Sequence, residues 1–131
     1  MFKVIKKEDI NKLNFEEKEF FVSNISQVRY LIDNRDSLVI IYEEEKVKGF
    51  FLVFKNNDSF HIAFYVVSPK LSNKEITKLI ENFLTYLEEL AKKEGIKIIW
   101  GGVDYYNDEL FEKFIEKGFS VVSYKMKKEI K

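Results

Sequence analysis

One long amphipathic helix pattern, set between two strand patterns, constrains the fold more than any other feature of the sequence. Apolar residues recur at steps of three and four from about Asn73 to Glu94, which predicts a helix with one buried face. Phe60–Val67 before it and Ile96–Val103 after it are rich in the apolar residues typical of strands. A strand, a long helix and a second strand in this order predict a parallel crossover, with both strands in one sheet.

Weaker patterns on either side of this unit predict the remaining elements. Phe60–Val67 is apolar at both alternate sets of positions, which predicts a strand buried on both faces. Gly95 and Gly118 predict the ends of two helices, since glycine readily adopts the left-handed backbone there. The other expected elements are an edge strand at Phe2–Lys6, one or two helices in Asp9–Ile25 with Asn14 as a cap, helical turns in Ser26–Asn34, strands at Leu38–Glu43 and Val47–Lys55, a helix at Asp108–Lys117 and a last strand at Phe119–Met126. This order predicts an α/β (α+β) mixed sheet, an antiparallel meander followed by a βαβ crossover.

Composition excludes several classes of protein. The 131 residues, 46% of them hydrophobic, predict a single domain over residues 1–131. Lys plus Arg and Asp plus Glu both number 22, so no net charge draws the chain to nucleic acid or to an anionic membrane. Without Cys, and with His61 as the single histidine, disulfides, Cys nucleophiles and multi-His metal sites are excluded, and we expect no metal. With no apparent targeting segment, the expected location is the cytoplasm.

Three short motifs, within about Leu38 to Met126, resemble one family. Val47–Phe50 reads Val-Lys-Gly-Phe after an acidic turn, Val67-Ser68-Pro69 ends the expected central strand, and Asn107 precedes Gly118-Phe119 by eleven residues. These motifs and the element order resemble the GNAT acyltransferase superfamily. The resemblance implies the GNAT fold and transfer of an acyl group from acyl-CoA to an amine, with acetyl-CoA as co-substrate.

The resemblance also implies where acetyl-CoA binds. The family holds the cofactor where the central strand ends and the long helix begins, because free backbone N–H groups at a helix start attract a diphosphate. The implied cofactor-binding residues are Tyr65, Val67, Ser72, Asn73, Lys74, Glu75, Ile76, Thr77 and Asn107. The family's loop carries Arg or Gln, then Gly, then Gly or Ala, where this sequence has Ser72, Glu75 and Thr77. The residues themselves read as a capping box, Ser72-x-x-Glu75, so a self-capped helix is the alternative to a phosphate site.

Candidates for proton transfer are few. A histidine exchanges protons near neutral pH, and alternation places His61 on the same side of its strand as Ala63 and Tyr65. The position that resembles the family's acidic tyrosine holds Phe114, or Ile115 if the match has a one-residue gap, and neither side chain has a proton to donate. The catalytic candidates are therefore His61, Asp104, Tyr105 and Tyr124. Gly101-Gly102 predicts a close backbone approach, placed where the family's two parallel strands separate around the cofactor.

Two functions follow, and the sequence leaves both open. The first is an acyl-CoA-dependent N-acyltransferase that acts on a small-molecule or peptide amine. The alternative is a GNAT-fold domain that has lost catalysis and serves as a binding or assembly module, which the changes at Ser72, Glu75, Thr77 and Phe114 favour. We expect neither nucleic acid nor membrane as a partner. A homodimer is compatible with the sequence.

Overall fold

The computed structural model of the protein describes residues 1–102, 108–122, 128 and 130. From the first strand to the last helix, its elements follow the order that the sequence predicts. The strands are β1 (Phe2–Ile5), β2 (Ser37–Glu44), β3 (Lys46–Lys55), β4 (Ser59–Val67) and β5 (Ile98–Trp100). The helices are a 3-10 helix (Lys7–Lys12), α1 (Lys18–Ser26), α2 (Arg29–Asn34), α3 (Asn73–Glu94) and α4 (Asp108–Glu116).

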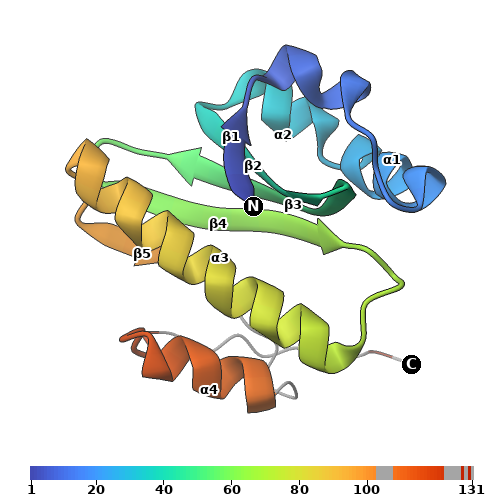
Figure 1. Ribbon diagram of the computed structural model, residues 1–131. Helices are drawn as coiled ribbons and strands as arrows, with labels where there is room; N and C mark the ends of the chain where they lie inside the picture. Colours follow the sequence, from blue (N-terminus) through green and yellow to red (C-terminus); the bar gives the residue numbers. More distant parts are fainter. Residues whose placement is uncertain (103–107, 123–127, 129, 131) are drawn as a thin grey trace.

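The five strands form one mixed sheet in the order of the sequence, β1-β2-β3-β4-β5. The first four are antiparallel neighbours, and β5 pairs parallel to β4 after the crossover through α3. This confirms the predicted meander and parallel crossover. Helices α1 and α2 cover one face of the sheet, and α3 and α4 lie on the other (Figure 1).

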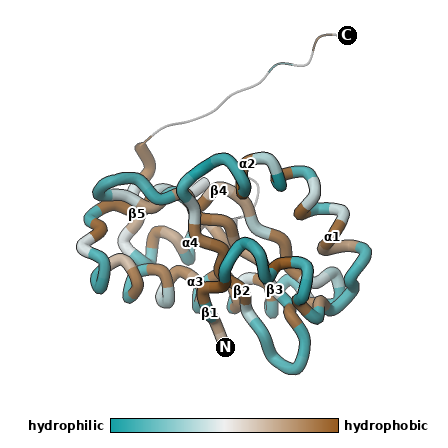
Figure 2. The backbone as a smooth tube through the Cα atoms, turned by 90° about the horizontal axis from the view of Figure 1, so that it is seen from above, coloured by the Kyte–Doolittle hydropathy of each residue, from teal (hydrophilic) through white to brown (hydrophobic). Residues whose placement is uncertain are grey.

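Each face of the sheet has its own hydrophobic core. On the α1/α2 face, alternate residues of β2 and β3 pack with helical residues that include Phe21 and Ile32. On the α3/α4 face, Phe51 and Phe60 pack with the apolar stripe of α3 and with two residues of α4. Phe51 and Phe83 stack with ring centroids 4.0 Å apart. Hydrophobic residues are therefore concentrated on the central strands, and hydrophilic residues on the outer turns (Figure 2).

Helix α3 has the bounds that its periodicity and caps predict. Its buried residues recur at helical spacing along one side. Gly95 ends it with a left-handed φ of 71°, and Ile96 N–H donates to the Ala91 carbonyl at 2.9 Å. None of the helices within residues 1–102 and 108–122 is long and apolar enough to cross a lipid bilayer.

The strand buried on both faces is β3 and not β4, so that prediction is wrong. Residues 49–54 of β3 are all buried, whereas His61, Ala63 and Tyr65 of β4 are exposed. The reason is position in the sheet. β3 lies between two long strands and under helices on both faces, whereas β4 adjoins a strand of only three residues.

Several element boundaries also differ from prediction. Asn14 does not cap α1; its carbonyl accepts from Val47 N–H, and α1 begins after Glu17, whose φ is 62°. β1 ends at Ile5, one residue early. The strand expected at Ile96–Val103 is only β5, and Val103 lies outside the described residues. The described part of the expected last strand, residues 119–122, is not strand, and residues 123–126 lie outside the described chain.

Candidate active site

The sheet opens between β4 and β5. Their pairing covers Ser59↔Ile98, Phe60↔Ile99 and His61↔Trp100, and within the described residues no β5 pairing continues past His61. Residues 62–67 of β4 therefore run roughly 16 Å along an edge that β5 does not cover. Gly101 and Gly102 leave β5 where the gap begins, as the sequence predicted for a close backbone approach.

A β-bulge lies at the start of this open edge. Leu52 of β3 is registered with Phe64, and the next residue, Val53, with Ile62, so Ala63 is the extra residue. Because one extra residue reverses the alternation, Tyr65 lies on the α3/α4 face and stacks on Phe51 at 6.0 Å. The prediction that His61 and Tyr65 share a side is therefore wrong.

His61 lies on the α1/α2 face, at the rim of the gap. Its ring meets Phe54 of the α1/α2-face core edge-on, with centroids 6.2 Å apart, and His61 itself is exposed. Its registered neighbour Trp100 is 44% exposed. His61 is thus available to a molecule that approaches the gap from the α1/α2 face.

A small apolar pocket lies at the gap on the opposite face. Its walls come from β4, the residues after β5, α3 and α4, and include Ile62, Tyr65, Phe83, Gly102 and Phe114. It has room for about one water molecule. This pocket and His61 lie on opposite faces of the sheet, at the same end of the open edge.

The other end of the open edge leads to the start of α3, where the predicted capping box is present. Glu75 N–H donates to Ser72 Oγ at 3.2 Å, and Ser72 N–H donates to Glu75 Oε1 at 3.0 Å. The hydrogen bonds from Ser72, with a smaller contribution from the charge of Lys48, hold the pKa of the Glu75 carboxyl below its ordinary value. The box uses one of the first three N–H groups of α3, which leaves those of Asn73 and Lys74 for an anion.

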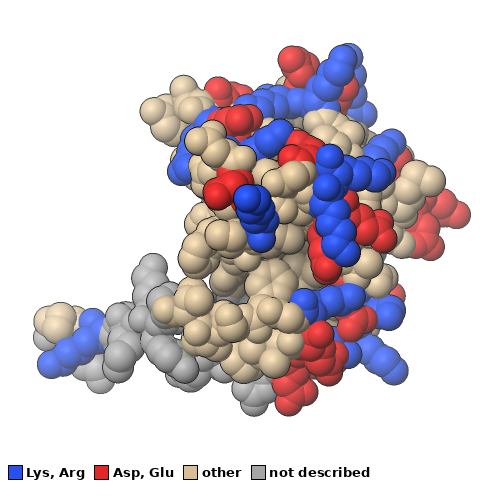
Figure 3. All heavy atoms as spheres, turned by 90° about the vertical axis from the view of Figure 1, so that its left-hand side faces the viewer, with Lys and Arg blue, Asp and Glu red and all other residues tan. Residues whose placement is uncertain are grey.

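Contacts from the segment before α1 hold the turn between β4 and α3. The buried Ser68 hydroxyl donates to Glu16 Oε1 at 2.9 Å, and the Ser68 N–H donates to the Lys48 carbonyl. Lys70 Nζ lies 3.3 Å from Glu17 Oε1 in an exposed ion pair. Charges of both signs are also intermixed elsewhere on the surface, as on the face in Figure 3.

The structure brings part of the predicted site together. Tyr65 and Val67 lie on the open edge of β4, and Ser72, Asn73, Lys74 and Glu75 form the start of α3. Ile76 packs against the α3/α4-face core, and Thr77 is buried. The remaining candidates, Asp104, Tyr105, Asn107 and Tyr124, lie outside the described residues.

The bulge at Ala63 and the wall residues Ile62, Phe83 and Leu110 were not among the predicted site residues. Gly101-Gly102 was the signal that located the gap. Nothing in the strand sequence marks the bulge, because no glycine or proline interrupts residues 59–67.

A family model described as the acetyltransferase (GNAT) family matches residues 7–119. The chain belongs to this family. As a GNAT acyltransferase, it has the reaction that the sequence predicted, transfer of an acyl group from acyl-CoA to an amine. No curated protein matches the sequence.

Solved GNAT structures share the fold over nearly the whole chain. The aminoglycoside N-acetyltransferase AAC(6')-Iy in complex with CoA is 8% identical, with a TM-score of 0.64 over 100% of this chain and 99% of that one. Ribosomal-protein-alanine N-acetyltransferase from Brucella melitensis biovar Abortus 2308 is 9% identical, with a TM-score of 0.65 over 99% and 97%. An IAA acetyltransferase from Bacillus cereus is 18% identical, with a TM-score of 0.63 over 94% and 78%.

Proposed function

We propose that the protein binds acetyl-CoA along the open edge of β4 and transfers the acetyl group to the amine of a small molecule or peptide. The observation that carries this proposal is the gap itself. A stretch of β4 that β5 does not cover connects the start of α3 to an apolar pocket at Ile62 and Gly102. An extended amide-containing chain such as pantetheine can pair with such an edge, as an added strand does. The CoA bound in the AAC(6')-Iy structure supports the choice of cofactor.

In this arrangement the diphosphate lies at the start of α3, where the Asn73 and Lys74 N–H groups and the helix dipole favour negative charge. The Glu75 carboxylate opposes binding there, because it adds a like charge beside the diphosphate. Lys70 and Lys74 are both exposed near the start of α3, and their positive charges offset part of this repulsion.

At the other end, the reaction needs little covalent chemistry from the protein. The amine nitrogen attacks the thioester carbonyl carbon, the carbon–sulfur bond breaks, and CoA leaves as a thiolate. A base takes one proton from the attacking nitrogen, and the thiolate gains one. Backbone N–H groups on the open edge of β4, near the Ala63 bulge, are our proposed donors to the thioester carbonyl oxygen. His61, on the face opposite the pocket, is our proposed base, acting directly or through water.

Calorimetric titration with acetyl-CoA and with free CoA tests this proposal. Glu75→Gln keeps a side chain that can complete the capping box but removes the charge. We expect it to bind CoA roughly two- to fivefold more tightly than wild type, with the gain reduced at high salt. Glu75→Gly should also bind more tightly, but with a lower melting temperature, because it loses the box and adds backbone freedom.

Weaker binding by Glu75→Gln would show that the carboxylate assists CoA rather than opposing it. If neither wild type nor either variant binds acetyl-CoA or CoA, the proposal fails and the binding-module alternative replaces it. A cytoplasmic location and a homodimer stay predictions from the sequence.

A further inference from the structure

The apolar pocket at the gap is closed on one side by Phe114 of α4. Its side chain is buried, and its ring lies directly against the backbone that follows β5. A Cβ atom added at Gly101 would lie 3.1 Å from Phe114 Cε2 and 3.4 Å from Ile62 Cδ1. Any larger residue at this position would therefore push the ring away from the strand end by a few tenths of an ångström.

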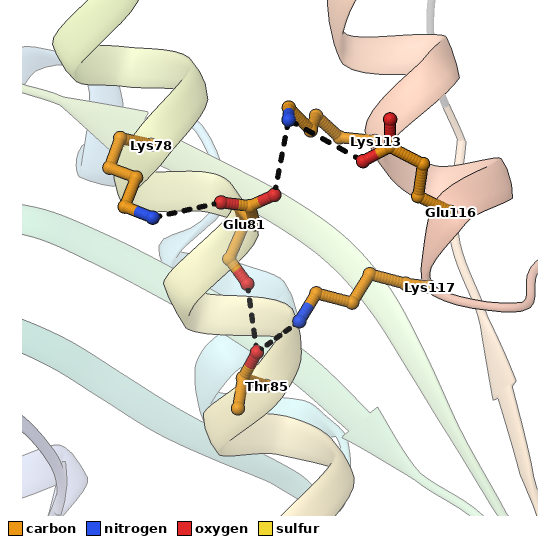
Figure 4. Close-up of polar contacts among 6 residues, drawn as sticks. All are labelled: Lys78, Glu81, Thr85, Lys113, Glu116 and Lys117. Carbon is orange, nitrogen blue, oxygen red and sulfur yellow. Dashed lines mark hydrogen bonds and ion pairs between the residues drawn. The ribbon is translucent and has the colours of Figure 1, made fainter.

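Neighbouring contacts keep the ring in place. Phe119 meets Phe114 edge-on, with ring centroids 4.9 Å apart. On the side of α4 that faces α3, Lys113 Nζ lies 3.4 Å from both Glu81 of α3 and Glu116 of α4. Just after α4, Lys117 Nζ donates to Thr85 Oγ1 of α3 at 2.5 Å (Figure 4). These contacts join one side of α4 to α3, so a movement of α4 that withdraws the Phe114 ring would break them.

The size of the pocket sets what it can hold. Space for about one water molecule also suits one methyl group, and the described walls are almost entirely hydrocarbon. Within the walls formed by the described residues, a longer acyl chain would displace the Phe114 ring or the α3 side chains Phe83 and Leu84, which are themselves packed in the core.

We infer that Phe114 limits the acyl group to acetyl, by closing the pocket at the point where the thioester lies in the proposed function, on which this inference rests. Each added methylene then costs roughly tenfold or more in binding or in kcat/KM. The residue that stands where the family's tyrosine is expected is thereby a specificity-determining residue and not a proton donor.

Equilibrium titrations of the full chain with free CoA, acetyl-CoA and butyryl-CoA test the inference without an acceptor. Wild type should bind acetyl-CoA about a hundredfold more tightly than butyryl-CoA, which has two more methylenes. Phe114→Ala should bring the two within about threefold of each other, and Phe114→Leu should give an intermediate ratio. Phe111→Ala removes the same side chain from an exposed position on the same helix and should keep the wild-type ratio.

Equal binding of acetyl-CoA and butyryl-CoA by wild type, together with binding of free CoA, would overturn this inference and leave the proposed function standing. If a folded Phe114→Ala or Phe114→Leu keeps the wild-type preference for acetyl-CoA over butyryl-CoA, the inference is also overturned and the proposed function stands. Circular dichroism establishes which variants are folded. If Phe114→Ala is not folded, the acetyl-CoA to butyryl-CoA ratio of Phe114→Leu tests the inference. If wild type does not bind free CoA, the proposed function itself is wrong.

Discussion

At the scale of single residues, the site depends on which face of β4 each side chain occupies. His61 and Ile62 are neighbours in sequence, yet His61 lies at the α1/α2-face rim and Ile62 lines the pocket on the other face. An acyl group held in the pocket and an amine that arrives beside His61 would meet at the gap from opposite sides. This geometry separates acyl binding from proton transfer, so the two can be tested apart.

Replacing His61 should therefore affect the rate and not cofactor binding. We expect His61→Gln to lower kcat by about a hundredfold or more, the usual size of a general-base contribution, with the dissociation constant of acetyl-CoA unchanged. Steady-state kinetics on a panel of amines, with calorimetry for acetyl-CoA, measure the two effects. Ile98→Ala changes an exposed neighbour on the same face and should leave both values near wild type. A kcat within twofold of wild type in His61→Gln would remove His61 from the mechanism.

At the scale of elements, one acidic residue connects the two helices that flank the pocket. Glu81 of α3 accepts from Lys78 at 3.1 Å and pairs with Lys113 of α4 at 3.4 Å (Figure 4). The hydrogen bond from Lys78 lowers the pKa of the Glu81 carboxyl most, and the hydrogen bond and charge of Lys113 lower it further. Glu81 in turn raises the pKa of Lys113. Helix α4 is short, so these contacts supplement the burial of Leu110 and Phe114.

The lowered pKa of Glu81 predicts how this link depends on pH. Because the folded pKa lies below the ordinary value of 4.5, the stabilisation is complete above that pH and is lost as pH falls through the folded pKa. Glu81→Gln should be less stable than wild type at pH 7, by no more than about 1 kcal/mol, and the difference should shrink below pH 4. Urea unfolding at both pH values measures this.

Glu88→Gln is the matched control, since Glu88 pairs with Lys92 within α3 at 3.5 Å and does not connect the two helices. It should change stability less than Glu81→Gln does. A difference between Glu81→Gln and wild type that grows on acidification would contradict the assigned direction of the pKa change.

At the scale of the whole molecule, two hydrophobic cores share one sheet. Phe21 belongs to the α1/α2-face core and Phe83 to the α3/α4-face core, and both are almost fully buried. β3 contributes Phe50 to one core and Phe51 to the other. Neither core can therefore unfold without exposing the strand that supports the other, which favours a single cooperative transition.

Large-to-small substitutions in either core should destabilise the whole chain. We expect Phe21→Ala and Phe83→Ala each to cost about 3–5 kcal/mol of unfolding free energy, a large share of the roughly 5–15 kcal/mol typical of a domain. Circular dichroism reports the helices, and fluorescence of Trp100, the one tryptophan, reports β5. The two probes should follow one transition in each variant, and the exposed Val22→Ala should be near neutral. Separate transitions would indicate that β5 and its pocket unfold independently of the α1/α2 face.

Local signals in the sequence determined the long helix, its caps, the meander and the family. The bounds of α3, the Ser72–Glu75 box and the turn at Gly95 depend on residues no more than about four apart, so the sequence contains them directly. The parallel pairing of β4 with β5 followed from the length of the intervening helix. Much of the cofactor end of the candidate site could be predicted for the same reason, because its residues are consecutive.

Tertiary structure alone decided which side chains meet at the gap. The Ala63 bulge exists only relative to β3, and it moves Tyr65 to the face opposite His61. The exposure of β4, the short β5 and the start of α1 at Lys18 depend on partners distant in sequence. Phe114 became a pocket wall because Gly101, thirteen positions earlier, admits its ring. Register and packing arise from contacts between distant segments, and no pattern within one segment specifies them.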